Sequence, residues 1–511
     1  METTTLSSSA VVRREGEEGD KNEESISLAA AAASLERAAV NRVVHAMREY
    51  HRSCDREIER RKRNGRKAIA MMRMKNEEKE KDDDAFVASP SPKSSPSSDD
   101  DDTKIGGPGT MTTKKNKKKK KRNVWLNWKA LERVYEDHDR KSRESVAKNQ
   151  RVFDALLATF SNAEHVPEHL RVRSDFSNVP ARERPPATPA SEDAEKARYV
   201  LKNLVRDWSE EGKEEREKSH HVLVRHLRDV VFKEQLSKTD RMYEGGGANP
   251  EDAARPRVLV PGAGLGRLVY EFAKAGFETE GNEFSYYMLF GASFLLNCCS
   301  EKRPYEIVPY WHSPLNHLSR EDQYRSVSIP DESPGDHVNE FKPGSSMAMC
   351  AGDFCEVYGK PEYQSHFDAV ACCFFLDTAK NILDYLDTIR FCLKKGGTLT
   401  SIGPLLWHWV DHSDQLGFGA SPLNKIDTTS FEKKGGGGGP KKHDDDDDVE
   451  DEDEDISIEV SLEDLIAFAE ELGFRLDVKR HPLACPYATD RTSMHRTVYD
   501  CAFLSFTLEE K

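Results

Sequence analysis

The fold is decided by residues 257–283, which run RVLVPGAGLGRLVYEFAKAGFETEGNE. This stretch divides into a short apolar strand, a glycine-rich turn, an amphipathic helix, a second strand and a closing acid: Arg257–Val260, Pro261–Gly266, Arg267–Ala275, Phe277–Gly281 and Glu283. The order of these features predicts the first unit of a nucleotide-binding α/β sheet, because each feature stands where such a unit needs it.

The glycine turn indicates which ligand this unit favours. Glycines let the backbone approach a ligand closely, and the helix that follows presents free N–H groups. Glu283 follows Gly262 at about 20 residues, the spacing at which these folds place a carboxylate on ribose hydroxyls. The turn has the spacing G-x-G-x-G, and Arg267 stands where a dinucleotide site has its third glycine. It therefore favours S-adenosylmethionine (AdoMet), which has no pyrophosphate, over a nicotinamide cofactor.

Residues beyond this unit repeat the alternation of β-rich runs and amphipathic helices. The alternation predicts an α/β domain with a mostly parallel sheet over residues 250–511. The further strands expected are Met347–Ala351, Phe367–Leu376 and Thr398–Ile402, with a late antiparallel pair at Phe474–Arg480 and Val498–Leu508.

Two strand ends carry further candidate residues. Asp353 and Phe354 follow one strand, and an acid before an aromatic residue suits adenine, since the acid accepts from the exocyclic amine and the ring stacks. The alternative is an Asp turn beside a core phenylalanine. Asp377 ends the apolar strand Phe367–Leu376, at the edge of the sheet where ligands bind.

The rest of the chain predicts helices separated by charged low-complexity segments. We divide it into a disordered tail (1–26), an N-terminal helix (27–75), a disordered charged linker (76–122), a helical region that includes a cofactor-contacting segment (123–245) and the α/β domain (250–511), which holds a disordered acidic insertion (431–455). Runs of like charge repel one another and stay solvated, which favours disorder in the linker and the insertion.

The basic run Lys114–Arg122 leaves two further interpretations open. It has the composition of a nuclear import signal or of a nucleic-acid tether. No aromatic residues alternate with its lysines, so the stacking surfaces of single-strand binders are missing.

Composition excludes several classes of protein. The 511 residues hold 76 Lys and Arg against 91 Asp and Glu, a formal charge of −15. We expect no bilayer-spanning segment, because no apolar run approaches ~18 residues, and no secretory signal in Met1–Asp20. The ten cysteines form no C-x-x-C pair, which predicts reduced thiols in the cytoplasm or nucleus. No pattern of metal ligands occurs, so no metal site is expected.

Several segments together resemble the carnosine N-methyltransferase family. They are Val205–Lys213, Val258–Leu268, Gly281–Glu283, Tyr287–Phe290, Ala351–Phe354, Cys373–Ala379 and Gly403–His408. The resemblance runs from Ala38 to Leu508, outside the two charged insertions. It implies a Rossmann-like, seven-stranded class I methyltransferase sheet preceded by helices. The implied reaction is AdoMet-dependent methylation of an imidazole nitrogen of histidine-containing dipeptides, with carnosine giving anserine.

The resemblance also implies the site residues. The expected AdoMet contacts are Asn203, Arg206, Gly262, Gly264, Gly266, Arg267, Glu283, Asp353, Phe354 and Cys373. Arg206 is expected on the methionine carboxylate, because a guanidinium fork suits a carboxylate. The expected substrate contacts are Asp377, His408, Tyr487 and Tyr499. Without the family, Arg206 is equally well a helix-surface arginine, and His408 and the tyrosines are equally well core residues.

Asp377 and His408 are the expected catalytic residues. Asp377 can accept the N–H of one ring nitrogen, which leaves the other unprotonated and favours the charge that develops on the ring. His408 would orient the dipeptide, and Tyr487 and Tyr499 would form aromatic walls or donate hydrogen bonds. Positioning then supplies most of the rate acceleration.

Other functions remain open at this stage. They are a methyltransferase for protein histidine or another imidazole compound, a non-catalytic AdoMet-binding scaffold, and a nicotinamide oxidoreductase. The glycine spacing argues against the oxidoreductase, and Asp377 argues against the scaffold. The expected partner is a small histidine-containing peptide. Family relatives suggest a homodimer, and we expect no membrane and no nucleic-acid partner, with a location in the cytoplasm and nucleus.

Overall fold

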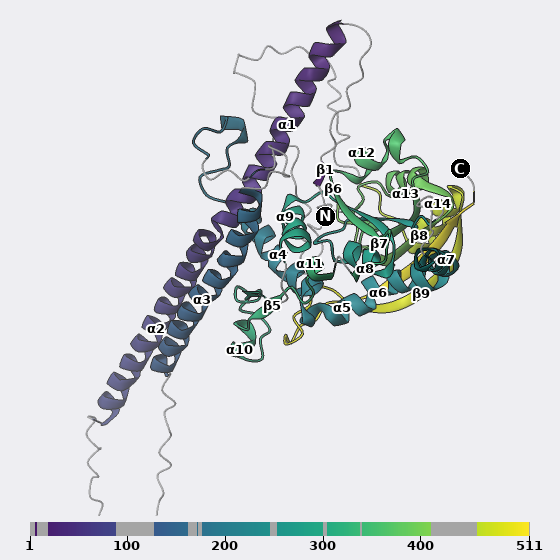
Figure 1. Cartoon of the computed structure of the whole chain (residues 1–511). Helices are drawn as coiled ribbons and strands as arrows, with labels where there is room; N and C mark the ends of the chain where they lie inside the picture. The colour runs from purple at the N-terminus through teal and green to yellow at the C-terminus, as the bar shows by residue number, and fades with distance from the viewer. Residues whose placement is uncertain are drawn as a thin grey trace, which may run out of the picture. The chain divides into compact units, whose positions relative to one another are not determined.

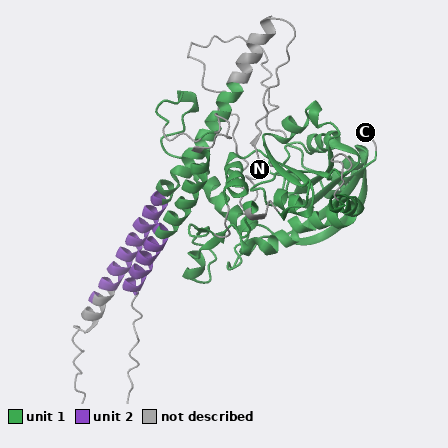
Figure 2. Cartoon of the chain, viewed as in Figure 1, with its two compact units in different colours: residues 1–54, 144–511 green, residues 55–143 purple. Residues whose placement is uncertain are grey.

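The structure is a computed structural model of the whole chain. It describes residues 6–7, 19–87, 127–161, 171, 176–245, 253–299, 304–337, 340–409 and 457–509. The chain divides into two compact units, residues 1–54 with 144–511, and residues 55–143 (Figure 2). The basic run Lys114–Arg122 and the acidic insertion 431–455 lie outside the described residues, so their predicted disorder stays a prediction.

The first unit is built on one twisted sheet (Figure 1). Its strands lie in the order β1-β6-β3-β2-β7-β8-β10-β9. Their bounds are β1 Leu6–Ser7, β2 Arg257–Pro261, β3 Glu278–Glu283, β6 Ser346–Ala351, β7 Phe367–Cys373, β8 Leu393–Gly403, β9 Phe474–Pro486 and β10 Val498–Leu508. Every neighbouring pair is parallel except the two pairs that β10 makes. The predicted α/β sheet, with its late antiparallel pair, is therefore confirmed.

Helices cover both faces of this sheet. Helices α12, α13 and α14 group at one side, and α6, α7 and α8 at the other (Figure 1). Their bounds are α6 His220–His226, α7 Lys233–Glu244, α8 Arg267–Ala275, α12 Phe354–Tyr358, α13 Ile382–Cys392 and α14 Leu462–Glu471. Apolar side chains of α12, α13 and α14 pack with Val370, Leu399 and Leu504 from the central strands into one buried core.

Helices α4 (Ser191–Trp208) and α5 (Lys213–Lys218) precede β2 in the chain. Helix α9 (Tyr286–Ser293) follows β3. A separate antiparallel hairpin, β4 (Tyr305–Ile307) with β5 (Val327–Ile329), was not expected from the sequence. Two short helices, α10 (Arg320–Gln323) and α11 (Pro334–His337), flank β5.

The N-terminal helix differs from its prediction. The chain forms two helices, α1 (Gly19–Arg48) and α2 (Tyr50–Val87), which are interrupted at Glu49. The helix thus begins inside the predicted tail and continues into the predicted linker. Glu and Lys dominate residues 76–81, and both are good helix formers despite their charge.

The second unit is an antiparallel pair of helical segments, from α2 and from α3 (Trp128–Ser161). Ion pairs join them along their length: Arg143 with Glu59 (2.6 Å), Lys62 with Asp139 (3.3 Å) and Arg73 with Glu132 (3.2 Å). The ring of Tyr135 lies so close to Gly65 that a Cβ there would stand 2.6 Å from it. The close approach of the two helices therefore depends on this glycine.

Candidate active site

A cavity of about 1490 Å³ opens at the carboxyl ends of β2, β3, β6 and β7. It brings together most of the predicted site residues: Asn203, Arg206, Gly262, Gly264, Glu283, Asp353, Phe354, Cys373, Asp377, His408, Tyr487 and Tyr499. Gly266 and Arg267 do not line it. The carboxyl edge of a parallel sheet is the usual place for a ligand, because the loops there come from several strands at once.

The glycine turn forms one wall of this cavity. Gly262, Gly264 and Gly266 have positive φ angles of 63°, 56° and 77°, which L side chains rarely adopt. A Cβ on Gly262 would stand 2.7 Å from Cδ2 of Phe375. A Cβ on Gly264 would meet only Asp207 Oδ2, at 3.9 Å, so the backbone of Gly264 faces open space. A ligand can approach the chain most closely at Gly264.

Glu283, at the end of β3, is held against this turn by the backbone. Its Oε2 accepts the N–H of Gly264 at 2.7 Å and its Oε1 accepts the N–H of Ser285 at 2.8 Å. Burial raises the pKa of this carboxyl, and the backbone donors oppose the shift. Each oxygen retains a lone pair that can accept a hydroxyl from the cavity.

Arg206, near the end of α4, presents its guanidinium to the cavity. Its Cζ lies 4.8 Å from the ring centroid of Tyr487 and 5.4 Å from that of Phe374. Its Nε is 3.7 Å from Asp207 Oδ1. The guanidinium donates no hydrogen bond to the described part of the chain. Burial would lower its pKa, but the carboxylate of Asp207 and other nearby groups raise it above the ordinary value. The cavity thus has a permanent cation in its wall whose N–H groups can donate to a ligand.

Asp353 and Phe354, the residues expected to contact adenine, also make contacts within the protein. Asp353 caps the N-terminus of α12, and its Oδ1 accepts the N–H groups of Cys355 (2.9 Å) and Glu356 (3.1 Å). This is the turn that the alternative interpretation expected. Phe354 is buried edge-on against Phe375, with ring centroids 5.3 Å apart, and still lines the cavity.

Asn203 and Cys373 complete the predicted cofactor wall. The Nδ2 of Asn203 donates to the carbonyl of Tyr199 at 3.0 Å. Cys373 ends β7, and burial raises the pKa of its thiol to about 12. A neutral thiol at this position can pack against a ligand without acting as a nucleophile.

Asp377 lies on a short 3-10 helix (Leu376–Thr378) just beyond β7. Its Oδ2 accepts the N–H of Leu406 at 3.0 Å, and its carbonyl accepts the N–H of His408 at 3.0 Å. Burial raises the pKa of this carboxyl, and the nearby His408 opposes the shift. The backbone therefore fixes one carboxylate oxygen in place and ties the segment of His408 to the same point.

His408 stands between two anchored tryptophans. The indole N–H of Trp407 donates to the carbonyl of Val460 (3.1 Å), and that of Trp409 donates to the carbonyl of Thr378 (3.0 Å). Trp407 itself has a positive φ of 41°. These contacts hold the segment so that His408 lies at the cavity wall.

Three aromatic rings face the cavity between Arg206 and Asp377. The centroid of Phe374 lies 4.9 Å from that of Tyr487 and 6.4 Å from that of Tyr499. The hydroxyl of Tyr487 shares a 2.8 Å hydrogen bond with the hydroxyl of Tyr199 on α4. Burial raises the pKa of Tyr487 well above its ordinary range, so the phenol stays protonated.

Sequence reasoning missed Asp207, Tyr199 and Phe374 as residues of this site. Two signals were present. Tyr199 and Arg206 stand seven residues apart on one helix, which places them on one face. Phe374 stands between Cys373 and Asp377, which are both predicted site residues. Its strained backbone, with a positive φ of 53°, could not be inferred from the sequence.

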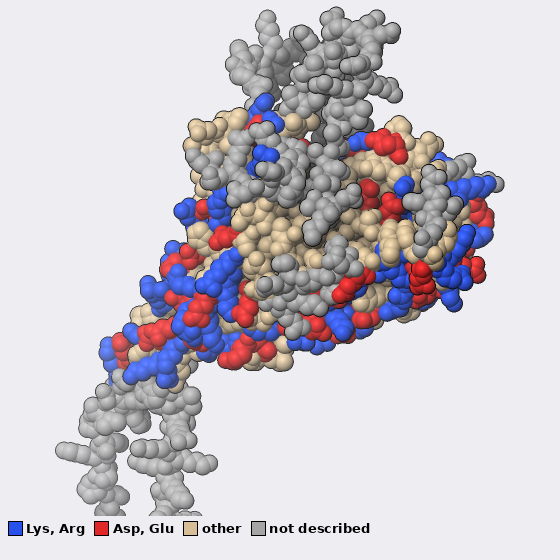
Figure 3. Space-filling view, viewed as in Figure 1, with Lys and Arg blue, Asp and Glu red and all other residues tan. Residues whose placement is uncertain are grey.

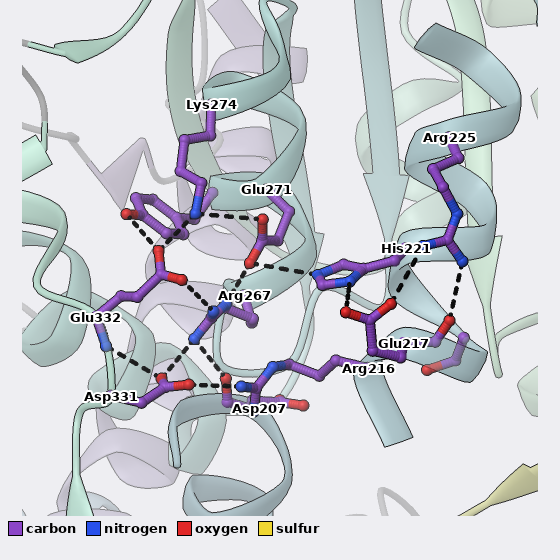
Figure 4. A network of polar contacts seen from close by, with 12 residues as sticks. Asp207, Arg216, Glu217, His221, Arg225, Arg267, Glu271, Lys274, Asp331 and Glu332 are labelled. Atoms are coloured by element: carbon purple, nitrogen blue, oxygen red, sulfur yellow. Dashed lines mark hydrogen bonds and ion pairs between the residues drawn. The ribbon is translucent and has the colours of Figure 1, made fainter. Parts of the chain in front are cut away.

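Arg267, an expected cofactor contact, is not among the residues that line the cavity. Its guanidinium is buried behind the turn, where it donates to Glu271 (2.8 Å), Asp331 (2.7 Å), Glu332 (3.3 Å) and the backbone carbonyl of Asp207 (3.1 Å) (Figure 4). It also lies 4.9 Å from the ring centroid of Trp208. The guanidinium also lies 5.7 Å from the ring centroid of Tyr270, so it packs among these groups and not at the cavity wall.

The comparisons with known proteins agree with this architecture. A family model described as carnosine N-methyltransferase matches residues 184–510. The chain belongs to the carnosine N-methyltransferase family. This match spans the glycine turn, every residue that lines the cavity and every strand of the sheet except β1.

Curated relatives and one solved structure illustrate the similarity. The carnosine N-methyltransferase of Schizosaccharomyces pombe is 35% identical over 305 residues, covering 60% of this chain and 68% of that protein. That of Mus musculus is 32% identical over 365 residues, covering 71% of this chain and 73% of that protein. Magnesium protoporphyrin IX methyltransferase from Synechocystis, solved with bound SAH, aligns at 13% identity and a TM-score of 0.28, over 60% of this chain and 93% of that chain. This score is too low for the alignment to support a conclusion.

Proposed function

We propose that this chain is an AdoMet-dependent N-methyltransferase that methylates an imidazole nitrogen of a histidine-containing dipeptide, converting carnosine to anserine. The observation that carries the proposal is one cavity, in a member of this family, that holds both a glycine turn with Glu283 and a buried Asp377 at the sheet edge. The first set suits a nucleoside-bearing methyl donor, and the second suits an imidazole.

The residues of the glycine wall fit AdoMet. The open backbone at Gly264, the lone pairs of Glu283 and the donors of Arg206 match an adenosine ribose and an amino-acid tail. When bound, AdoMet supplies an electrophilic methyl group on a sulfonium. The chain's own part on this side is to hold and orient the donor and to exclude water from it.

Asp377 has the placement needed to control the imidazole. With Oδ2 fixed by Leu406, the other oxygen can accept the N–H of one ring nitrogen. This hydrogen bond selects the tautomer in which the second nitrogen is unprotonated and nucleophilic. It also stabilises the positive charge that the ring gains on methylation.

The aromatic rings beside Asp377 support the same chemistry. Phe374, Tyr487 and Tyr499 offer π faces, which attract a cation, to a ring that becomes positively charged. His408, tied to Asp377 through the backbone, is placed to orient the rest of the peptide.

The proposal extends to the location of the chain and to its partners. None of the ten cysteines, all of which lie within the described residues, forms a disulfide, which supports a reducing location such as the cytoplasm and nucleus. On the face shown in Figure 3, basic and acidic side chains are intermixed around a central area of other residues, and this mixing of signs argues against nucleic acid as a partner. Within the described ranges, no helix has the length and apolarity to cross a bilayer. A homodimer rests on the family resemblance alone.

The test is product analysis. The purified chain would be incubated with AdoMet and a panel of histidyl dipeptides, histidine and a histidine-containing protein, and the products analysed by fragmentation mass spectrometry. We expect one added methyl on the imidazole ring of carnosine. Methylation of the protein in preference to every dipeptide would favour the alternative substrate class, and no methylation of any of them would contradict the proposal.

A further inference from the structure

Asp207 has a buried side-chain carboxylate in the cavity wall, and no group among the described residues donates a hydrogen bond to that carboxylate. Its exposed fraction is 5%, and its Oδ1 accepts no hydrogen bond within the described structure. Its Oδ2 is the nearest atom to the open side of Gly264, at 3.9 Å from the Cβ position of that glycine. The carboxylate therefore lies where the glycine turn comes closest to a ligand.

The backbone around Asp207 is clamped to that turn from behind. The carbonyl of Asp207 accepts a hydrogen bond from Arg267 at 3.1 Å, and the indole of Trp208 donates to the carbonyl of Leu265 at 3.0 Å. Arg267 is itself held by Asp331, Glu271 and Glu332 in the network of Figure 4. The end of α4 and the glycine turn are thus linked as one piece, and the Asp207 side chain is directed to the cavity side.

The cations near Asp207 do not satisfy it. Nε of Arg206 is 3.7 Å from Oδ1, which is beyond hydrogen-bond distance. Arg216 directs its Nη donors to Asp331 (2.5 Å) and to the carbonyls of Arg206 (2.8 Å) and Ser209 (2.9 Å). An unsatisfied buried carboxylate is costly, so its retention at a ligand wall points to a donor that arrives with the ligand.

We propose that Asp207 binds the α-ammonium group of the amino-acid tail of the methyl donor, beside Arg206, which takes the α-carboxylate. This inference rests on the proposed function. Adjacent residues at the end of α4 then present an anion and a cation to a zwitterion that carries the opposite pair. The arrangement selects a donor with an intact amino-acid tail.

Calorimetry on the full-length chain can separate this role from a structural one. The ligands are S-adenosylhomocysteine, its deaminated analogue, its decarboxylated analogue and 5′-methylthioadenosine, which lacks both charged groups. We expect Asp207→Asn to weaken S-adenosylhomocysteine and the decarboxylated analogue about 10- to 100-fold, since each loses a charge-assisted hydrogen bond. The two ligands without an ammonium group should bind the variant and the parent equally.

Two control variants sharpen the result. Arg206→Met should weaken the ligands that keep a carboxylate and spare the decarboxylated analogue. Glu283→Gln should weaken all four ligands by a similar factor, because the ribose is common to them. A uniform loss across the four ligands in Asp207→Asn would overturn the inference, since it would indicate a structural role for Asp207.

The parent chain alone gives a second measurement, should Asp207→Asn fail to fold. The parent should bind S-adenosylhomocysteine at least about 10-fold more tightly than its deaminated analogue. Equal affinity would overturn the inference while leaving the proposed function intact. No binding of any of the ligands by folded parent would overturn both.

Discussion

At the scale of single residues, the site depends on carboxylates held in place by backbone N–H groups. Glu283 is fixed by Gly264 and Ser285, and Asp377 by Leu406. Asp377 is buried and Glu283 is half-buried, and burial raises the pKa of each carboxyl. Such groups are oriented before any ligand arrives, so little reorganisation is needed on binding.

Asp377→Asn should separate chemistry from cofactor binding. We expect the rate of carnosine methylation to fall by at least ~100-fold, because the amide cannot act as a charged acceptor for the ring N–H. Calorimetry should show unchanged S-adenosylhomocysteine binding, since Asp377 lies on the imidazole side. The exposed Asp384→Asn on α13 is the matched control and should keep parental activity. A fully active Asp377→Asn would remove Asp377 from the mechanism.

At the scale of elements, the turn between β2 and α8 depends on both conformation and close packing. The ring of Phe375, which a Cβ on Gly262 would approach to 2.7 Å, is stacked on Tyr385 with centroids 4.7 Å apart and cannot easily give way. Gly262→Ala should therefore destabilise folding by about 2–4 kcal/mol through strain and overpacking, and should weaken S-adenosylhomocysteine binding.

Gly396 supplies the control for that substitution. Its φ is 77°, but a Cβ there would meet nothing within 4 Å. Gly396→Ala should cost only the conformational strain, about 1–2 kcal/mol, with cofactor binding unchanged. Urea denaturation and calorimetry on the two variants measure both quantities. Equal costs would show that the contact with Phe375 is unimportant.

The charge network behind the turn predicts a pH dependence of stability. His221 lies between Glu271 (3.7 Å) and Glu217 (3.1 Å), and these carboxylates, Glu271 most, raise its pKa above 6.5 (Figure 4). A raised pKa in the folded chain means that protonation favours folding. The stabilisation by protonated His221 is fully present at pH values below the ordinary histidine pKa. It is lost as the pH rises through the pKa that His221 has in the folded chain.

His221→Gln should therefore lower the melting temperature more at pH 5.5 than at pH 8.5. His366 is the contrasting control, because burial lowers its pKa. Because folding favours its neutral form, His366→Gln should lower the melting temperature less at pH 5.5 than at pH 8.5. A His221→Gln effect that does not change with pH would show that the network does not need the imidazolium.

At the scale of the whole molecule, the residues that line the cavity all belong to the unit formed by residues 1–54 and 144–511. Next to the two breaks in this unit, the helices contact each other directly: Asn149 donates to the Tyr50 hydroxyl at 3.2 Å, and Gln150 accepts from the His51 N–H at 3.0 Å. A short linker can therefore join Cys54 to Glu144.

Replacing residues 55–143 with a short Gly/Ser linker should leave cofactor affinity and carnosine turnover close to those of the parent. The same replacement carrying Asp377→Asn provides the inactive reference. Calorimetry and product formation measure the two properties. A loss of S-adenosylhomocysteine binding by folded, shortened protein would show that the helical unit contributes to the cavity.

The sequence by itself determined the parts of this protein that depend on neighbours in the chain. The order strand, glycine turn, helix, strand and Glu283 is local, and so are the cap at Asp353 and the helix of α4. Periodicity and turn chemistry act within a few residues, which is why the predicted strand, turn and helix around the glycines formed, α4 formed within the predicted helical region, and Asp353 made the turn given as the alternative. The family match added the residues of the site but not their directions.

Only the tertiary structure decided which side chains share the cavity. Arg267 follows the glycine turn directly yet faces the buried network, while Asp207, far away in the chain, stands beside Gly264. Tyr199 and Tyr487 meet across 288 positions of sequence. The direction of a side chain depends on how its helix or strand packs against others, and a pattern of neighbouring residues does not contain that packing.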